Sequence, residues 1–387
     1  PDLYVVSGGY SNSTDGSYQD RLYINDHGVF KRKENALPVA LISGSCVRPV
    51  DIDGDGDIDL FVGGRVVPGQ YPRSPENRLL INDGKGNFTN QTAAFSTSLS
   101  HIGMVTDALW MDVNHDKKFD LVLCGEWMHL YCFENGGNKL SDMSYKYFDT
   151  SITGLWNRLQ VADLNGDGHP DIIAGNWGNN SQLHASAAEP VEMYYGDFDE
   201  NGYVDPLLCY YIEGVSYPMA SRDELTDQIV SLRQRFPTYD SYSQATIKDV
   251  LSKEQLDTAK KLSANYLNTC WFENKNEKFI KHELPLQANY SPVYAIVTDD
   301  FNDDGNMDIL LGGNIDHTRI KIGKIDANYG VVLTGDGKGN FTYLNQMLSG
   351  LNIKGCVRDF VIIKTNATNK KIISAVNDDK PLELIYK

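Results

Sequence analysis

The chain has 387 residues, of which 52 are acidic and 35 basic, and its formal net charge at pH 7 is −17. This charge argues against binding to nucleic acid or to anionic membrane surfaces, because both need basic patches. No apolar stretch approaches the ~20 residues of a membrane-spanning helix, so this segment is not expected to insert directly into a membrane.

The N-terminal region predicts β-structure. A short apolar run, PDLYVVSGG, is followed by DRLYINDHGVFK from Asp20, in which two apolar segments flank a turn. Asn-Gly or Asp-Gly between apolar or aromatic segments is the strongest short-range signal for a β-hairpin. Related patterns are NRLLINDGKGNFT from Asn77, HLYCFENGGNKL from His129, CWFENKNEKF from Cys270 and YGVVLTGDGKGNFT from Tyr329. We therefore expect five hairpins along the chain.

A second motif, DIDGDGDIDLFVGG at 51–64, concentrates aspartates before an apolar strand. It returns as DVNHDKKFD from Asp112, DLNGDGHPD from Asp163, DFDENGYVD from Asp197 and DFNDDGNMD from Asp300. Each copy has Asp or Asn at positions one, three and five and Asp at position nine, and calcium loops begin with this ligand spacing. Carboxylates so close together resist joint ionisation unless a cation binds between them. The five loops therefore predict five metal sites.

These loops differ from helix-loop-helix calcium sites at position twelve, where such sites need a bidentate glutamate. Position twelve is apolar in all five copies, which have Val62, Leu123, Ala174, Leu208 and Leu311 there. The flanking residues are β-rich, as in VRPV before the first loop and LFVGG after it. Each loop is therefore expected to join two strands, with position nine as its closing carboxylate.

The repeat period is close to fifty residues once one insertion is removed. The loop starts are 61, 51, 34 and 103 residues apart, and the last interval contains a helical pattern. Ser221 precedes Glu224, and Ser252 precedes Gln255, at capping-box spacing. The segment KEQLDTAKKL predicts a second helix. Removal of a helical insert at about 214–265 reduces the last interval to 51 residues.

Each repeat is a four-stranded unit, in which an acidic loop joins the first two strands and a Gly-rich turn joins the last two. Such a unit has the length of one propeller blade. The segments DIDGDGDIDLFVGG and DLNGDGHPDIIAG resemble FG-GAP or VCBS-type repeats, which occur in integrin α-chain propellers and in bacterial secreted or surface proteins. In such repeats, calcium is held by the side chains at positions one, three, five and nine and by the carbonyl at position seven. The resemblance implies these calcium ligands: Asp51, Asp53, Asp55, Asp57 and Asp59; Asp112, Asn114, Asp116 and Asp120; Asp163, Asn165, Asp167, His169 and Asp171; Asp197, Asp199, Asn201, Tyr203 and Asp205; Asp300, Asn302, Asp304, Asn306 and Asp308.

The Asp112 loop departs from the family pattern, because Lys117 occupies position six, where the other loops have glycine. A left-handed backbone at a non-glycine residue costs roughly 1 to 2 kcal/mol. Lys117 and Lys118 also bring positive charge next to the ion. Of up to five calcium sites, we expect the Asp112 loop to be the weakest or empty, with a lysine ammonium as a possible substitute for the cation. The Asp51 loop, which has five carboxylates, should bind calcium tightly.

The expected fold is all-β: a single β-propeller domain over residues 1–387, with four-stranded antiparallel blades and the helical insert at about 214–265. Asp2 falls at position nine of a repeat whose first eight positions are missing, so the chain is expected to begin inside a blade. At the other end, VRDFVIIKT, KKIISAVND and PLELIYK predict three strands of a blade without an acidic loop. Counting both partial units favours seven blades. The short 34-residue interval leaves open a six-bladed ring with the Asp197 loop inserted in one blade.

The six cysteines show no CxxC or metal-ligand spacing and lie in or near apolar strands. Buried free thiols are expected, and a disulfide between Cys124 and Cys132 across a hairpin is the alternative. The disulfide state therefore does not indicate the cellular compartment.

Four residues follow soon after the strands that begin at the acidic loops: Arg65, Trp127, Trp177 and Asn314. If the blades are arranged radially, these residues return to equivalent places on one rim and form a composite site there. Aromatic residues also concentrate outside the strands, in the segments GQYPRSPENR, NWGNNSQLH and FPTYDSYSQ. Tyr and Trp together with Arg are typical of carbohydrate and protein binding sites.

The motifs favour a non-catalytic, calcium-stabilised binding module that contacts a protein or a glycan. An extracytoplasmic location, whether secreted, periplasmic or at the cell surface, suits calcium loops that bind in the millimolar range. The alternative is a glycan-active enzyme, a lyase or hydrolase, with a site on the propeller face. No HExxH, GxSxG or Walker motif is present. Hydrolysis would require two carboxylates outside the calcium loops, roughly 5 to 9.5 Å apart.

Overall fold

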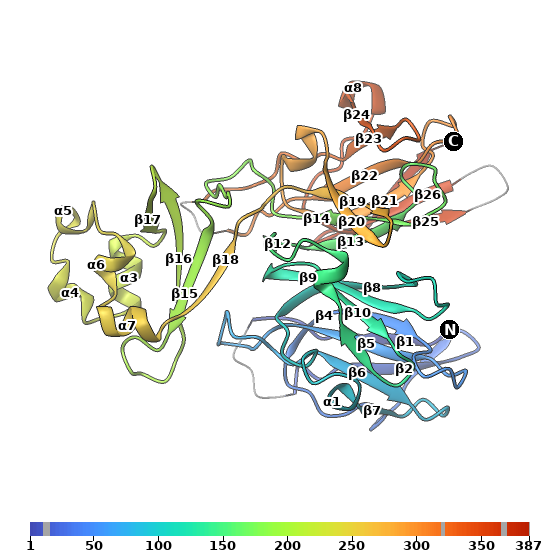
Figure 1. Cartoon of the computed structure of the whole chain (residues 1–387), viewed down its shortest axis with the longest axis horizontal. Helices are drawn as coiled ribbons and strands as arrows, with labels where there is room; N and C mark the ends of the chain where they lie inside the picture. Colours follow the sequence, from blue (N-terminus) through green and yellow to red (C-terminus); the bar gives the residue numbers. More distant parts are fainter. Residues whose placement is uncertain (11–15, 319–321, 365–369, 387) are drawn as a thin grey trace.

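Figure 1 shows the computed structural model of the chain, which describes residues 1–10, 16–318, 322–364 and 370–386. Within these residues the strands form seven antiparallel sheets. Six of them occur in chain order, and we refer to each sheet by its strands. Their strands are β1 (Leu3–Val5), β2 (Arg21–Asp26) and β3 (Val29–Arg32); β4 (Ser43–Val50), β5 (Asp59–Val66), β6 (Arg78–Asn82) and β7 (Phe88–Asn90); β8 (Met104–Met111), β9 (Asp120–Met128), β10 (Tyr131–Asn135), β11 (Leu140–Asp142) and β12 (Gly154–Leu155); β13 (Arg158–Ala162), β14 (Asp171–Gly175), β19 (Cys270–Lys275) and β20 (Lys278–Glu283); β21 (Val293–Asp299), β22 (Asp308–Gly313), β23 (Val331–Gly335) and β24 (Phe341–Leu344); β25 (Val357–Lys364), β26 (Lys370–Val376) and β27 (Leu382–Tyr386).

The six sheets pack against one another in succession. The first strands β4, β8, β13, β21 and β25 are neighbours in that order. The β1–β3 sheet joins the series through Gly44, whose N–H donates to the carbonyl of Ser7 at 2.9 Å. Each pair of consecutive sheets also shares an apolar core, and Leu121 and Phe133, for example, pack with Phe61 of β5. The chain therefore has the expected all-β, propeller-like fold.

The seventh sheet interrupts the β13/β14/β19/β20 sheet. We call the interrupting segment, residues 176–269, the arm. Figure 1 shows the arm projecting away from the other sheets. Its strands are β15 (Val191–Gly196), β16 (Asp205–Ile212), β17 (Val215–Pro218) and β18 (Lys260–Ala264), in the sheet order β17-β16-β15-β18. The Asp197 loop joins β15 to β16, as in the six-bladed alternative, and the favoured count of seven blades is not confirmed.

Five short helices cover the arm sheet: α3 (Arg222–Gln228), α4 (Leu232–Arg235), α5 (Tyr239–Tyr242), α6 (Ile247–Val250) and α7 (Lys253–Thr258). They lie within the predicted insert at 214–265. The segment that interrupts the blade is longer than this prediction, because strands β15 and β16 also belong to it. The second predicted helix also ends earlier than expected, since Lys260 begins β18.

The local signals for the arm helices are confirmed. Ser221 and Glu224 form a capping box at the start of α3, and Ser252 and Gln255 form one at α7. Both boxes satisfy backbone N–H groups that have no partner within the helix. The remaining helices are α1 (Thr92–Phe95), α2 (Ser144–Tyr147), α8 (Gln346–Ser349) and the 3-10 helix η1 (Leu286–Asn289). Among the described residues, no helix has both the length and the apolar character needed to cross a bilayer.

All five predicted hairpins are present, as β2–β3, β6–β7, β10–β11, β19–β20 and β23–β24. The three predicted C-terminal strands are β25 to β27. All six cysteines are buried free thiols. A disulfide between Cys124 and Cys132 does not form, because Cys132 lies opposite Val122 in the β9–β10 register. Asp2 accepts the N–H of Asn25 at 2.9 Å, as position nine does in the complete repeats.

A buried aspartate lies between the inner strands of three sheets. Asp107 of β8 is 1% exposed. Its Oδ1 pairs with the guanidinium of Arg48 from β4 and accepts the N–H of Ala108 at 2.8 Å. Its Oδ2 accepts the N–H of Leu159 at 3.0 Å and lies 3.5 Å from Nε of Arg158 in β13, an ion-pair distance rather than a well-formed hydrogen bond. Two arginines and two amides thus compensate one buried charge.

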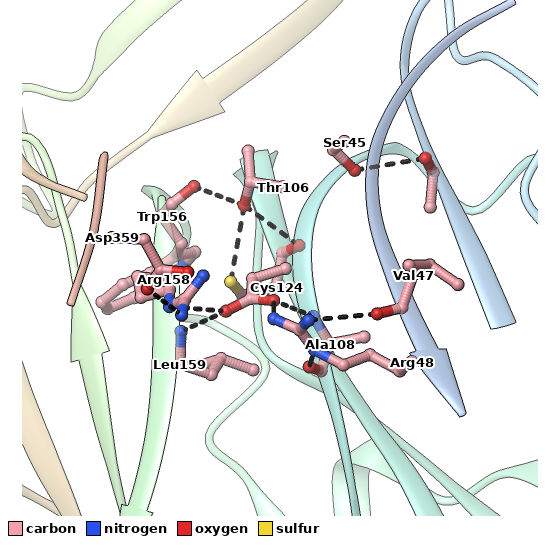
Figure 2. A network of polar contacts seen from close by, with 12 residues as sticks. Ser45, Val47, Arg48, Thr106, Ala108, Cys124, Trp156, Arg158, Leu159 and Asp359 are labelled. Atoms are coloured by element: carbon pink, nitrogen blue, oxygen red, sulfur yellow. Dashed lines mark hydrogen bonds and ion pairs between the residues drawn. The ribbon is translucent and has the colours of Figure 1, made fainter. Parts of the chain in front are cut away.

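The same network reaches a fourth sheet. Nη2 of Arg158 donates to Asp359 of β25 at 2.6 Å, and Figure 2 shows the two side chains facing each other. β13 and β25 are separated by β21 in the order of neighbouring strands. The contact between Arg158 and Asp359 therefore ties together two sheets that are not consecutive in the series.

Replacement of Asp107 should test this network. Removal of one partner from a buried ion pair leaves the other charge uncompensated, so Asp107→Ala should lower the free energy of unfolding by about 3 to 5 kcal/mol. Urea denaturation followed by circular dichroism would measure the loss. Asp26→Ala is the matched control, because Asp26 forms an ion pair with Lys31 at the surface and exposed pairs contribute little. Equal effects of the two substitutions would contradict a central role for Asp107.

Candidate metal loops and the arm pocket

The five acidic loops occupy the same place in five sheets. Each joins the first strand of a sheet to the second in chain order, and position nine is the first residue of that second strand. These residues are Asp59 of β5, Asp120 of β9, Asp171 of β14, Asp205 of β16 and Asp308 of β22. The predicted placement between two strands is therefore confirmed for every loop.

The loop side chains fold the backbone by a repeated set of hydrogen bonds. In all five loops the carboxylate at position one accepts the N–H of position six at 2.8 to 3.1 Å. The side chain at position five accepts the N–H of position seven at 2.8 to 2.9 Å. In four loops position three accepts the N–H of position five at 3.0 to 3.3 Å. Asp199 is different, because its Oδ1 is buried and has no hydrogen-bond partner among the described atoms.

The carboxylate at position nine connects each loop to the rest of its sheet. These five aspartates are between 0 and 3% exposed. One oxygen accepts the N–H of loop position two at 2.9 to 3.1 Å. In four sheets the other oxygen accepts a backbone N–H of the third strand at 2.8 to 2.9 Å. In the arm, Nε2 of Gln228 donates instead, at 3.2 Å.

Burial of these carboxylates disfavours their charged form. Burial raises the pKa of Asp120 and of Asp171 to about 6, although the backbone hydrogen bonds that these carboxylates accept lower it. Burial also raises the pKa of Asp59, Asp205 and Asp308, and the negative charge of the neighbouring loop carboxylates raises it further. A bound cation would offset both causes.

Positions one, three and nine converge in the loops that have Asp at all three. In the Asp51 loop, oxygens of Asp51, Asp53 and Asp59 lie within 4.8 Å of one another. In the Asp197 loop, Asp197, Asp199 and Asp205 do the same. The other three loops have Asn at position three, whose amide oxygen is a neutral ligand. Such sets of carboxylate and amide oxygens fit a hard cation such as Ca²⁺.

The loop backbone is left-handed at two positions. At position four φ lies between 58° and 77°, and at position six between 71° and 93°, in all five loops. Position six is glycine in four loops and Lys117 in the Asp112 loop, with φ of 71°. The predicted backbone strain at Lys117 is therefore present.

A pocket of about 290 Å³ lies between the arm and the six packed sheets, next to Asp205 of the Asp197 loop, to which Gln228 of the pocket donates at 3.2 Å. We call it the arm pocket, and the described residues that line it are Tyr71, Glu126, Trp127, Leu155, Trp177, Leu183, Met193, Pro206, Leu208, Met219, Ala220, Gln228 and Ile322. Trp127 is the eighth residue of β9, which starts at the acidic loop. At ~3.3 Å per residue, the two ends of that strand are on the order of 25 Å apart.

The predicted composite rim is present in part. Trp127 and Trp177 both line the arm pocket. Nη2 of Arg65 donates to Glu126 of the pocket at 2.5 Å. Asn314 instead has a structural role, because it is 2% exposed and its side chain bonds the backbone of Asn328 and Gly355.

Several polar residues of the pocket carry little or no signal in the sequence. Glu126 carries no local motif, and Gln228 was expected only as part of a helix. Tyr71 lies in the aromatic segment GQYPRSPENR, which was the one available signal.

Comparison with known proteins identifies an FG-GAP-like repeat at residues 112–174, which include the second and third acidic loops. No curated protein matches the chain. Among solved structures, the V. cholerae biofilm matrix protein Bap1 is 12% identical, with a TM-score of 0.30 over 97% of this chain and 81% of that chain. Saccharomyces cerevisiae Sqt1 is 12% identical, with a TM-score of 0.42 over 95% of this chain and 79% of that chain. These distant similarities carry no argument about function.

The strain at Lys117 predicts a stabilising substitution. Lys117→Gly should raise the free energy of unfolding by about 1 kcal/mol, because relief of the left-handed backbone outweighs the extra chain entropy of glycine. Urea denaturation in excess chelator would isolate this backbone effect from cation binding. Lys117→Ala is the control, since it removes the charge and keeps Cβ. Equal stability of the two variants would show that the strain has no measurable cost.

Proposed function

We propose that the chain is a calcium-stabilised β-propeller module that binds a protein or glycan ligand without catalysis. The observation that carries the calcium proposal is the five-fold repetition of one loop geometry around oxygen ligands. Each loop holds Asp or Asn at positions one, three, five and nine, and each buries the carboxylate at position nine. The FG-GAP-like repeat at 112–174 supports a binding module with a propeller-like fold.

In this proposal, bound calcium would stabilise the folded protein. The ligands would be the side chains at positions one, three, five and nine and the carbonyl at position seven, as in the resembling family. The cation would offset the repulsion among the loop carboxylates, and it would hold the connection between the first two strands of each sheet. An extracytoplasmic location, where calcium is abundant, is part of the same proposal.

The arm pocket favours binding over the alternative of glycan hydrolysis. Glu126 is the one carboxylate among the described residues that line the pocket, and it pairs with Arg65. A glycosidase needs a second carboxylate, roughly 5 to 9.5 Å from the first. The pocket therefore offers a place for a ligand and lacks the usual acid–base pair.

Removal of calcium should destabilise the protein. A site that binds only the folded state contributes about 1.4 kcal/mol when calcium is at ten times Kd, so five sites approach ~7 kcal/mol. Scanning calorimetry with calcium and with EDTA should show a fall in Tm of many degrees. Magnesium addition is the control for a general charge effect. An unchanged Tm in EDTA, after dialysis long enough for exchange, would refute the calcium proposal.

The loops should also differ in occupancy. The Asp51 loop combines five carboxylates with glycines at positions four and six, so it should be fully occupied. The Asp112 loop should be the weakest or empty site, because Lys117 and Lys118 add positive charge to a strained loop. Anomalous scattering from crystals grown in calcium would measure each occupancy. A strong peak at Asp112 beside an empty Asp51 loop would reverse this ranking.

A further inference from the structure

We propose that the arm pocket binds one neutral sugar ring of a glycan. This inference rests on the proposed function and narrows its ligand from a protein or glycan to a glycan. It rests on the size and lining of the pocket, and on which of its hydrogen-bond donors and acceptors already have partners.

The size and the walls of the pocket suit one ring with an apolar face. A volume of about 290 Å³ is near the lower end of the ~300 to 1,000 Å³ typical of small-molecule pockets, which suits a ligand of the size of a single hexose. Tyr71, Trp127 and Trp177 contribute aromatic surface, and Met193 and Leu208 of the arm sheet contribute flexible and aliphatic surface. The C–H face of a pyranose packs well against an aromatic ring of this kind.

The indole and hydroxyl donors of the pocket already have acceptors. Nε1 of Trp127 donates to the hydroxyl of Tyr71 at 2.9 Å, and that hydroxyl donates to Oε2 of Glu126 at 3.3 Å. Nε1 of Trp177 donates to Ser181 at 3.0 Å. Burial and the neighbouring Glu126 raise the pKa of Tyr71 well above its usual value, so its hydroxyl remains a donor.

The acceptors of the pocket retain free capacity. A carboxylate accepts about four hydrogen bonds, and Glu126 accepts two from described residues, one from Arg65 and one from Tyr71. Nε2 of Gln228 donates to Asp205, and no described donor reaches its Oε1. A ligand that fits therefore supplies hydrogen-bond donors to Glu126 and Gln228.

Two other ligand classes fit less well. An apolar peptide side chain would bury the acceptors of Glu126 and Gln228 without partners, which is unfavourable. An ammonium group would supply donors, but Arg65 already neutralises Glu126 and would repel a second cation. A neutral sugar supplies hydroxyl donors to Glu126 and Gln228. It carries no charge that Arg65 would repel, and it presents an apolar face to the aromatic walls of the pocket.

The test is a titration of the whole chain in calcium, followed by tryptophan fluorescence and by saturation-transfer NMR. The probes are glucose, galactose, mannose, N-acetylglucosamine and disaccharides of each. At least one sugar should bind saturably to the wild-type protein. Trp177→Ala and Glu126→Gln should each weaken that binding about tenfold or more, as loss of a central contact does. Glu126→Gln preserves the side-chain volume and keeps the test usable if Trp177→Ala does not fold.

Tyr145→Ala is the matched control, because Tyr145 is 72% exposed and does not line the pocket. This variant should keep full affinity. Saturable binding of N-acetyl-leucinamide or butylammonium in place of any sugar would overturn the proposal. So would an absence of sugar binding, or sugar binding that both pocket variants leave unchanged. A calcium-dependent Tm without sugar binding would contradict only the pocket assignment, whereas sugar binding with a Tm insensitive to EDTA would contradict only the calcium proposal.

Discussion

In each repeat a buried aspartate begins the second strand and accepts two N–H donors, one from its own acidic loop and one from outside it. In four sheets the outside donor is the backbone of the third strand. One side chain thus fixes the loop, the second strand and the third strand relative to one another. A buried carboxylate without partners would be far more costly than one with two, so this geometry tolerates little variation.

The same carboxylate explains why the loops are so acidic. Its burial penalises a negative charge, and the neighbouring loop carboxylates increase that penalty. Hydrogen bonds from two amides offset part of this cost, and a cation held by the remaining oxygens would offset more. Much of the net charge of −17 is therefore concentrated at candidate cation sites. The buried Asp107 network solves a similar problem differently, since two arginines compensate that carboxylate.

The features that could be predicted from the sequence depend on close spacing along the chain. The acidic loops, the five hairpins and the two capping boxes each involve residues fewer than about fifteen positions apart, and each is found where it was predicted. The extent of the arm was missed, because the Asp197 loop of the arm has the same pattern as the loops of the other sheets, and because β18 continues directly from a helical segment. The arm pocket combines Tyr71, Glu126 and Gln228, and the Asp107 network combines Arg48 and Arg158. These residues are far apart in sequence, and no local spacing indicates that they meet.

The arm also affects how its host blade can fold. β14 must pair with β19, yet the whole of 176–269 is synthesised between these two strands. The ends of the arm are tied together at its base, where Gly178 N–H donates to Leu267 at 2.7 Å and Asn176 donates to Tyr266 at 3.0 Å. An arm that folds first would therefore bring β14 and β19 close together and replace a long chain closure by a short one. In a nascent chain, the unpaired edge of β14 would then be exposed only until the arm closes.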